Sequence, residues 1–169
     1  RKQSLQIMGE SLTLLLVSLE DANEKYLSWL NDPEVNMFLE TRFEIQNLER
    51  IRTFIEKVNG GTNEVLFAIL LREKLEHIGN IKIGPINYHH QSAELSYFIG
   101  EKNNWGKGFA TEAIALCTKF GFEKLSLEKL EAGCYASNIG SQRALEKAGF
   151  TLEGRLRDKL LGANGVRED

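Results

Sequence analysis

Two glycines one residue apart, Gly106 and Gly108, stand directly before a long helical pattern in the stretch "NNWGKGFATEAIALCTKFGF". The loop joins the end of a strand pattern to a helix start, where unpaired backbone N–H groups and the helix dipole attract anions. Glycine lets a phosphate approach the backbone closely, and Lys102 and Lys107 add positive charge. The loop therefore predicts an anion site, with a merely structural turn as the competing interpretation.

Two common phosphate-binding motifs do not fit this loop. A Walker loop needs GxxxxGK[ST], but Lys107 is followed by Gly108 and no glycine lies five residues before Gly106. A Rossmann fingerprint needs a third glycine where Thr111 stands. The anion is therefore not expected to be held as in either of those nucleotide-binding folds.

A second polar position follows a later strand pattern, in "NIGSQRALEKAGF". Asn138 is placed both to cap the helix that follows and to project a polar side chain beside the end of the preceding strand. A simple helix cap would explain Asn138 equally well, so the residue by itself leaves both interpretations open.

The elements that must position these residues follow from hydrophobic periodicity. Asp21 and Glu24 have capping-box spacing at the first expected helix. The order indicates a mixed α/β fold (α+β mixed) and one domain over residues 1–169, not the alternating βαβ pattern of a doubly wound sheet. The expected strands are 11–19, 64–71, 77–88, 93–100, 129–136 and 150–162, and the expected helices are 21–30, 45–59, about 108–124 and 138–149.

Composition limits the classes of partner. With 42% hydrophobic residues, 27% charged residues and no apolar run long enough to cross a bilayer, the chain is expected to be soluble, without a membrane partner. A net charge of -3 argues against nucleic acid. Cys117 and Cys134 lack metal-ligand spacing, and His89 and His90 would point to opposite faces of a strand. We therefore expect free thiols, no metal and a cytoplasmic location.

Three segments together, "AELSYFIG", "WGKGFATEA" and "NIGSQRALEKAGFTLEG", resemble the GNAT acetyltransferase superfamily, in particular its ribosomal-protein N-terminal acetyltransferase-like branch. The similarity runs from about Ser11 to Asp169. It implies the GNAT fold, a central mixed and mostly antiparallel sheet splayed into a V with helices on both faces, and acetyl-CoA as co-substrate. The family signature, Gln or Arg followed by xxGxG or xxGxA, falls on Asn103 to Gly108, with Asn103 replacing the usual Gln or Arg.

The resemblance also implies a set of cofactor contacts. The main chain of Phe98 and Ile99 is expected to hold the pantetheine arm and the acetyl oxygen. Asn103, Asn138 and Arg143 complete the cofactor-binding set, although an exposed helix arginine is the competing interpretation of Arg143. The pyrophosphate is expected on the N–H groups of Gly106, Lys107, Gly108, Phe109 and Ala110, with the hydroxyl of Thr111.

Acetyl transfer to an amine needs a neutral amine, a polarised thioester carbonyl and a stabilised thiolate. Glu94 is the expected base, because strand alternation puts it on one face with Ser96 and Phe98. His89 and His90 are the alternative bases, with an ordinary pKa near 6.5.

For the leaving group, many relatives carry a tyrosine where this chain has Leu145. Ser141, one turn after Asn138, is the nearest hydroxyl that could hydrogen-bond the departing sulfur. Cys117 and Cys134 fall within expected helix and strand, so no nucleophile supports a covalent route and direct transfer in a ternary complex is expected.

The acceptor side is expected on the connection between the first two helices, at Phe38, Glu40 and Arg42. The resemblance leaves two kinds of acceptor open, an amino sugar linked to a nucleotide and a protein N-terminal amine. The opposing class is a catalytically silent acyl-CoA-binding module. Relatives carry a further strand after the region that ends here at Asp169, so we expect a missing final strand or a partner that supplies that edge, such as a second copy in a homodimer.

Overall fold

A six-stranded sheet forms the centre of the protein, which is described here by a computed structural model of residues 5–169. The strands lie in chain order, and every neighbouring pair is antiparallel except β5 and β6, which are parallel. The mixed, mostly antiparallel sheet expected from the sequence is confirmed. Its strands are β1 (Gln6–Met8), β2 (Leu12–Leu16), β3 (Val65–Leu71), β4 (His77–Asn87), β5 (Ser92–Ile99) and β6 (Lys129–Glu131).

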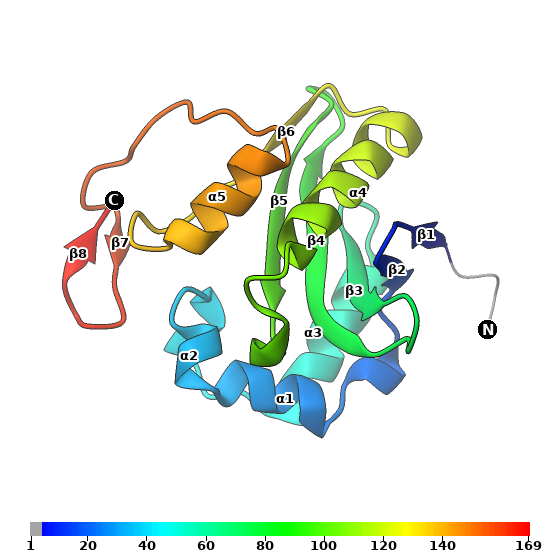
Figure 1. The fold of residues 1–169 in the computed structure, drawn as a ribbon, viewed down its shortest axis with the longest axis horizontal. Helices are drawn as coiled ribbons and strands as arrows, with labels where there is room; N and C mark the ends of the chain where they lie inside the picture. The colour runs from blue at the N-terminus through cyan, green and yellow to red at the C-terminus, as the bar shows by residue number, and fades with distance from the viewer. Residues whose placement is uncertain (1–4) are drawn as a thin grey trace.

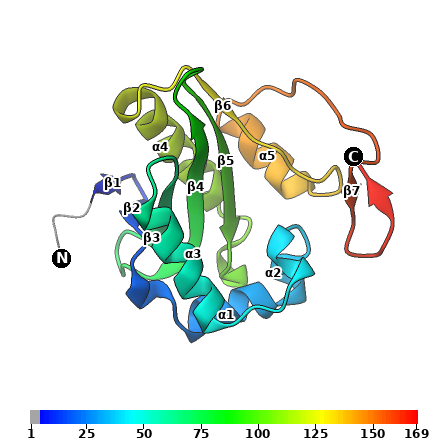
Figure 2. The same ribbon diagram turned by 180° about the vertical axis from the view of Figure 1, so that it is seen from behind.

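Helices cover both faces of this sheet, as Figures 1 and 2 show from opposite sides. α4 lies in front of the sheet in Figure 1, whereas α3 lies in front of it in Figure 2. No helix within residues 5–169 is both long enough and apolar enough to span a bilayer. The helices are α1 (Glu24–Asn31), α2 (Pro33–Asn36), α3 (Leu48–Gly60), α4 (Phe109–Lys124) and α5 (Ile139–Lys147), with short 3-10 turns at Leu19–Asp21, Glu40–Phe43 and Lys102–Asn104.

Strand alternation divides the apolar side chains between two cores, one on each face of the sheet. In β5, Tyr97 and Ile99 pack on the core that includes buried residues of α4 and α5. Phe98 packs on the opposite core, with Tyr26 and Trp29 of α1. The same alternation fixes which side chains of β5 can face each layer of the molecule.

β5 and β6 separate soon after they meet. Their parallel pairing covers only Ser92 to Glu94 of β5, opposite Lys129 to Glu131 of β6. On its other side β5 stays paired with β4 as far as Ile99. The backbone edge of β5 beyond Glu94 is therefore not paired with β6. This unpaired edge forms the opening of the V-shaped splay.

The last part of the chain differs from the sequence prediction. No strand spans 150–162; residues 151–159 are exposed and without regular structure. A separate two-stranded sheet follows instead, made by β7 (Leu160–Leu161) and β8 (Arg167–Glu168), which lies apart from the main sheet in Figure 1. The prediction was wrong because alternating apolar residues can form a strand only where a neighbour offers backbone partners.

The expected cap of the first helix was also wrong. The capping box is formed by Ser18 and Asp21 at a preceding 3-10 turn, and α1 is capped by Asn23, whose side chain accepts from the Tyr26 N–H at 3.1 Å. Asp21 and Glu24 have the right spacing, but Asp21 is the last residue of the preceding 3-10 turn, where its carboxylate accepts from the Ser18 N–H, so it does not begin α1.

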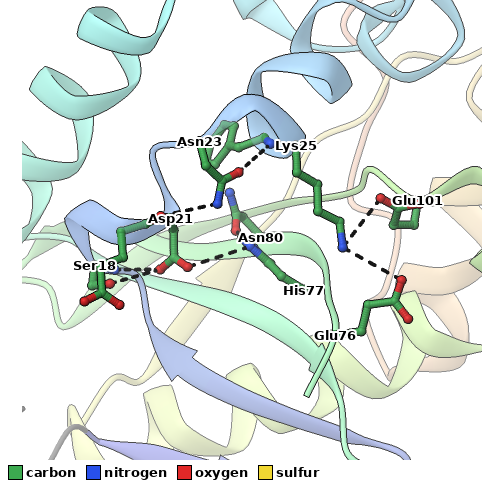
Figure 3. A network of polar contacts seen from close by, with 10 residues as sticks. Ser18, Asp21, Asn23, Lys25, Glu76, His77, Asn80 and Glu101 are labelled. Carbon is green, nitrogen blue, oxygen red and sulfur yellow. Dashed lines mark hydrogen bonds and ion pairs between the residues drawn. The ribbon is translucent and has the colours of Figure 1, made fainter. Parts of the chain in front are cut away.

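A partly buried polar network joins α1 and the turn before it to the start of β4 (Figure 3). The His77 Nε2 atom lies 2.7 Å from the Asn80 Oδ1 atom, and His77 Nδ1 lies 4.0 Å from an Asp21 carboxylate oxygen. The imidazole also packs edge-on against the Trp29 ring, with centroids 5.0 Å apart. Burial lowers the pKa of His77, although the hydrogen bond to Asn80 Oδ1 and the charge of Asp21 oppose the shift while Lys25 adds to it. The network therefore holds a neutral imidazole.

His77→Gln should lower stability at neutral pH by about 1 kcal/mol, the usual worth of a hydrogen bond, and the loss should shrink as the pH falls. The folded state binds a proton on His77 less readily than the unfolded state does, so the parent loses stability as the pH drops through about 6.5. Glutamine does not titrate, so the variant lacks this pH-dependent loss of stability. Urea unfolding of both proteins between pH 7.5 and 5 measures the gap, and a gap independent of pH would contradict the assignment. His89→Gln, at an exposed histidine, is the control.

Candidate active site

The glycine loop has the backbone geometry that an anion site requires. Gly106 and Gly108 adopt φ values of 73° and 81°, in the left-handed region that favours glycine. Gly108 is the N-cap of α4 and makes no side-chain capping bond. Within residues 5–169, side chains of Asn or Asp cap the other four α-helices. The N–H groups at the start of α4 are thus left without a side-chain cap, and Phe109, Ala110 and Thr111 form its first turn.

The charges near this loop differ from the sequence expectation. Lys102 lies 2.8 Å from an Asp32 carboxylate oxygen and 3.7 Å from one of Glu34. The hydrogen bond with Asp32 raises the pKa of Lys102, and the same bond lowers the pKa of Asp32. Lys102 therefore ties the loop to α2 instead of offering its charge to a ligand. Lys107 and Asn103 are exposed.

Two indole groups hold the loop against the sheet and α1. Trp105 Nε1 donates to the Ile99 carbonyl at 2.8 Å, and Trp29 Nε1 donates to a Glu101 carboxylate oxygen at 3.0 Å. Gly100 lies so close to the Trp29 ring that an added Cβ would come within 2.2 Å of it. A hollow of about 240 Å³ lies at this junction of α1 with the loop. The loop is thus fixed at the end of β5 by groups on both sides.

The backbone groups of β5 alternate between its two edges. The Gly100 N–H donates to the Ile78 carbonyl at 2.7 Å, so the main chain of Phe98, two residues earlier, faces β4. The main chain of Tyr97 and Ile99 faces the open edge, which agrees with the Ile99 carbonyl accepting from Trp105. Of the two backbone positions expected to hold the pantetheine arm, Ile99 is on that edge and Phe98 is turned away from it.

The first turn of α5 places Ser141 beside the same open edge. Asn138 caps the helix, its Oδ1 atom accepting from the Ser141 N–H at 3.2 Å. The Ser141 hydroxyl lies 2.7 Å from the phenolic oxygen of Tyr97. Leu145, one turn further, is buried in the core, and Arg143 is exposed. The helix thus brings one hydroxyl of the sequence prediction to β5.

Replacing Asn138 tests whether the residue is only a helix cap or also contacts the ligand. Asn138→Ala should lower the free energy of unfolding by about 1 kcal/mol through loss of the cap, whereas Asn138→Ser keeps a capping oxygen and should recover most of it. Urea titration measures both. If the Asn138 amide also contacts CoA, both variants should bind CoA more weakly than the parent. Parental stability together with parental CoA affinity in Asn138→Ser would show that Asn138 acts only as a helix cap.

Glu94 lies where β5 and β6 part. It is the last residue of β5 that pairs with β6, directly opposite Glu131, and both side chains are exposed. His89 and His90 lie in the turn between β4 and β5, where their N–H groups donate to Asn87 Oδ1 at 3.0 and 3.1 Å. Glu94 is thus the one of these three candidates that lies at the apex of the splay.

The three residues expected at the acceptor side gather around Tyr135. Its hydroxyl donates to a Glu40 carboxylate oxygen at 2.9 Å and accepts from Arg42 at 3.3 Å, and its ring lies 5.6 Å from that of Phe38. Arg42 also donates to the Leu161 carbonyl at the start of the C-terminal hairpin. Burial, followed by the Glu40 carboxylate, raises the pKa of Tyr135. The phenol therefore stays protonated and orders this cluster.

The two cysteines are free thiols. Cys117 is buried in α4, and burial raises its pKa to about 12. Cys134 is half-buried, and burial raises its pKa as well. It follows β6 and is not within a strand, contrary to the sequence expectation. A thiolate nucleophile is not favoured at either position.

Comparison with known proteins identifies the family to which a chain with this loop and strand edge belongs. Residues 11–151 match the family described as Acetyltransferase (GNAT) domain. The chain is a GNAT acetyltransferase. It is 36% identical over 155 residues to the uncharacterized N-acetyltransferase p20 of Bacillus licheniformis, covering 88% of this chain and 84% of that protein. The family resemblance stated from the three sequence segments is confirmed.

Two further relatives are informative. A spermidine N(1)-acetyltransferase of Vibrio cholerae is 33% identical over 92 residues, covering 54% of this GNAT chain and 52% of that protein. The structure of the microcin C7 self-immunity acetyltransferase MccE, solved with acetyl-CoA and AMP, superposes with a TM-score of 0.77 at 25% identity, covering 95% and 89% of the two chains. The protein is thus an N-acetyltransferase of a family whose acyl donor is acetyl-CoA.

Sequence reasoning missed two hydroxyls of this GNAT protein. Tyr97 was considered only for the face of β5 on which it lies, yet its phenol reaches Ser141. Tyr135 follows the shortened β6 and connects all three acceptor-side candidates. A tyrosine near the C-terminal end of each predicted strand flanking the splay was the available signal, because a buried or partly buried phenol usually finds a hydrogen-bond partner.

Proposed function

We propose that this enzyme transfers the acetyl group directly from acetyl-CoA to an amine in a ternary complex, with both substrates meeting along the open edge of β5. The uncapped start of α4 at one end of that edge, with Glu94 at the other, is the observation that carries the proposal. A donor bound by its pyrophosphate at the loop has its pantetheine arm directed along the same edge.

The donor is held mainly by backbone groups. The N–H groups of Gly106 and Gly108 and of the first turn of α4 bind the pyrophosphate, because helix N-termini combine unpaired donors with a favourable dipole. The Thr111 hydroxyl and Lys107 assist them. The pantetheine arm follows the open edge at Ile99 and Tyr97, Asn138 contacts it from the α5 side, and Arg143 reaches a CoA phosphate. Glycine and Lys107 at the loop fit a double phosphate, and the exposed Asn103 adds a polar side chain at its rim.

The chemistry requires no covalent enzyme intermediate. The amine nitrogen attacks the thioester carbonyl, a C–N bond forms, and the amine proton passes to the Glu94 carboxylate directly or through water. The C–S bond then breaks and its electron pair goes to sulfur, where the Ser141 O–H donates a hydrogen bond to the thiolate. Since an ordinary thiol has a pKa of about 8.5, the thiolate leaves without first taking a proton from the enzyme.

The acceptor amine approaches from the cluster around Tyr135. Glu40 contributes a negative charge that attracts a protonated amine, and Phe38 offers an aromatic surface. The amine belongs to a small molecule, such as a nucleotide-linked amino sugar, or to a protein N terminus. Because one relative is named as a spermidine N(1)-acetyltransferase, polyamines also belong in any test of acceptors.

The test is a screen of amines with acetyl-CoA, reading thiol release and identifying the acetylated product by mass spectrometry. Amino sugar nucleotides, short peptides with free N termini and polyamines form the panel. We expect thiol release with one class and a product heavier by one acetyl group. Tight CoA binding without amine-dependent release, whichever amine is offered, would instead support a silent binding module.

Composition and surface character suggest the setting of the reaction. Two free thiols suit a reducing compartment, so we place the enzyme in the cytoplasm, with no membrane or nucleic acid as partner and with no metal. We treat residues 1–169 as one acetyltransferase domain. We propose a homodimer because apolar side chains are exposed at Leu152 and Leu156, in the segment before the small C-terminal sheet, and at Val166, in its hairpin.

A further inference from the structure

Two hydroxyl groups bridge the arms of the splay. The phenolic oxygen of Tyr97 lies 2.7 Å from the Ser141 Oγ atom. Tyr97 comes from β5, beyond the last residue paired with β6, whereas Ser141 comes from the first turn of α5, which follows β6. The hydrogen bond therefore crosses from one arm to the other at the edge where the donor is proposed to lie.

Apart from its hydroxyl torsion, Ser141 is fixed in place. Its N–H donates to Asn138 Oδ1 at 3.2 Å, and the next turn of α5 is anchored in the core through Leu145 and Ala144. This packing does not set the direction in which the Ser141 O–H points. A hydrogen bond donated to Ser141 Oγ would set it, because a hydroxyl that accepts at a lone pair turns its own proton elsewhere.

Tyr97 is suited to be the donor in this pair. Its ring is half-buried and packs on the core, so the phenol cannot turn freely to water. Burial raises the pKa of Tyr97, with a smaller raising effect from Cys134 and an opposing effect from Ser141. The phenol therefore keeps its proton wherever a neutral amine can react.

We propose that Tyr97 is a positioning residue for the leaving group: its O–H donates to Ser141 Oγ and so directs the Ser141 O–H at the CoA sulfur. This inference rests on the proposed function, in which Ser141 stabilises the departing thiolate. When the C–S bond breaks, the electron pair and negative charge stay on sulfur and both hydroxyls keep their protons. Tyr97 acts through Ser141 and does not need to touch the substrate.

The kinetic test compares Tyr97→Phe with Ser141→Ala and the double variant. Loss of one neutral hydrogen bond predicts that kcat falls roughly 3- to 10-fold in Tyr97→Phe while KM for acetyl-CoA changes by less than about twofold. In the Ser141→Ala background, Tyr97→Phe should have no further effect on kcat. Multiplicative effects in the double variant would overturn the proposal, because Tyr97 would then act independently of Ser141. Tyr88→Phe, which removes an exposed phenol in the β4–β5 turn, is the matched control.

A second test needs no acceptor. CoA itself is bound to each protein, and the pKa of its thiol is followed through the ultraviolet absorbance of the thiolate. The parent should lower this pKa relative to free CoA, and both Tyr97→Phe and Ser141→Ala should raise it again by about 0.5 to 1 unit. A thiol pKa unchanged in both variants would overturn the proposal, even in an active enzyme.

The two readouts separate the failures. If the thiol pKa moves as expected but no amine is acetylated, the proposed function fails and the positioning role of Tyr97 stands. If amines are acetylated but the thiol pKa is the same in Tyr97→Phe as in the parent, the proposed function stands and the positioning role of Tyr97 fails. A parent protein that does not bind CoA overturns both the function and the positioning role. Should Tyr97→Phe not fold, 3-fluorotyrosine at this position keeps the ring and strengthens the donor, so it should lower the thiol pKa further.

Discussion

A Gly108→Ala enzyme should bind acetyl-CoA roughly 10- to 100-fold more weakly than the parent, with little change in its fold. Gly108 has φ of 81°, a left-handed conformation that costs an L-residue roughly 1–2 kcal/mol. Nothing lies within 4 Å of an added Cβ, so the strain is conformational and not a clash. Relaxation of that strain turns N–H groups at the start of α4 away from the pyrophosphate, and each bond to a charged group contributes about 1.5–3 kcal/mol.

Isothermal titration with CoA measures this effect without an acceptor. Gly60→Ala is the matched control, because Gly60 also has open space around its added Cβ but lies at the end of α3 without a left-handed backbone. It should bind CoA as the parent does. Parental affinity in Gly108→Ala would show that the loop is only a turn, the simpler interpretation that the sequence left open.

Glu94→Gln should lower kcat by about 100-fold or more while leaving CoA affinity within about twofold. General-base catalysis by a positioned carboxylate typically contributes 10²–10⁴-fold, and glutamine keeps the shape of the side chain but cannot accept the amine proton. Because the side chain is exposed at the edge of β5, its replacement should not disturb folding. Steady-state rates across a range of pH, with the acceptor found by the screen, provide the measurement.

Glu131→Gln is the natural control for this variant. Glu131 lies opposite Glu94 in the parallel pair and is equally exposed, so the two substitutions remove the same charge from the same edge. We expect a small effect at Glu131. A pH–rate profile of Glu94→Gln that matches the parent would contradict the assignment of Glu94 as the base. A large loss of kcat in Glu131→Gln, with none in Glu94→Gln, would instead assign the base to Glu131 on β6.

The parts of the fold that the sequence predicted well are those with local signals. β3, β4 and β5 fall within a residue or two of the predicted strands, since alternating or continuous apolar runs there are bounded by turn residues. The start of α4 was also predicted from Gly106 and Gly108, because a positive φ before a helical pattern favours glycine. Such features depend on the residues themselves and not on distant partners.

The parts that were missed depend on partners far along the chain. Residues 129–136 look like one strand, but only Lys129 to Glu131 find backbone partners on β5 before the strands part. β1 forms because Gln6 to Met8 pair with β2, which no local pattern required. The hydroxyl bridge from Tyr97 to Ser141 joins residues 44 positions apart, so strand alternation could give the face of Tyr97 but not its partner.

The Tyr135 cluster has a consequence for how such an enzyme can diverge. Its members are drawn from the α2 connection, the segment after β6 and the C-terminal hairpin, through Glu40, Arg42 and Leu161. The donor loop, by contrast, is a continuous stretch at the start of α4. With the acceptor and donor sites placed as proposed above, substitutions in the first group would change the choice of amine and leave the binding of the acyl donor as it is. One scaffold can therefore supply a series of acetyltransferases that differ in what they modify.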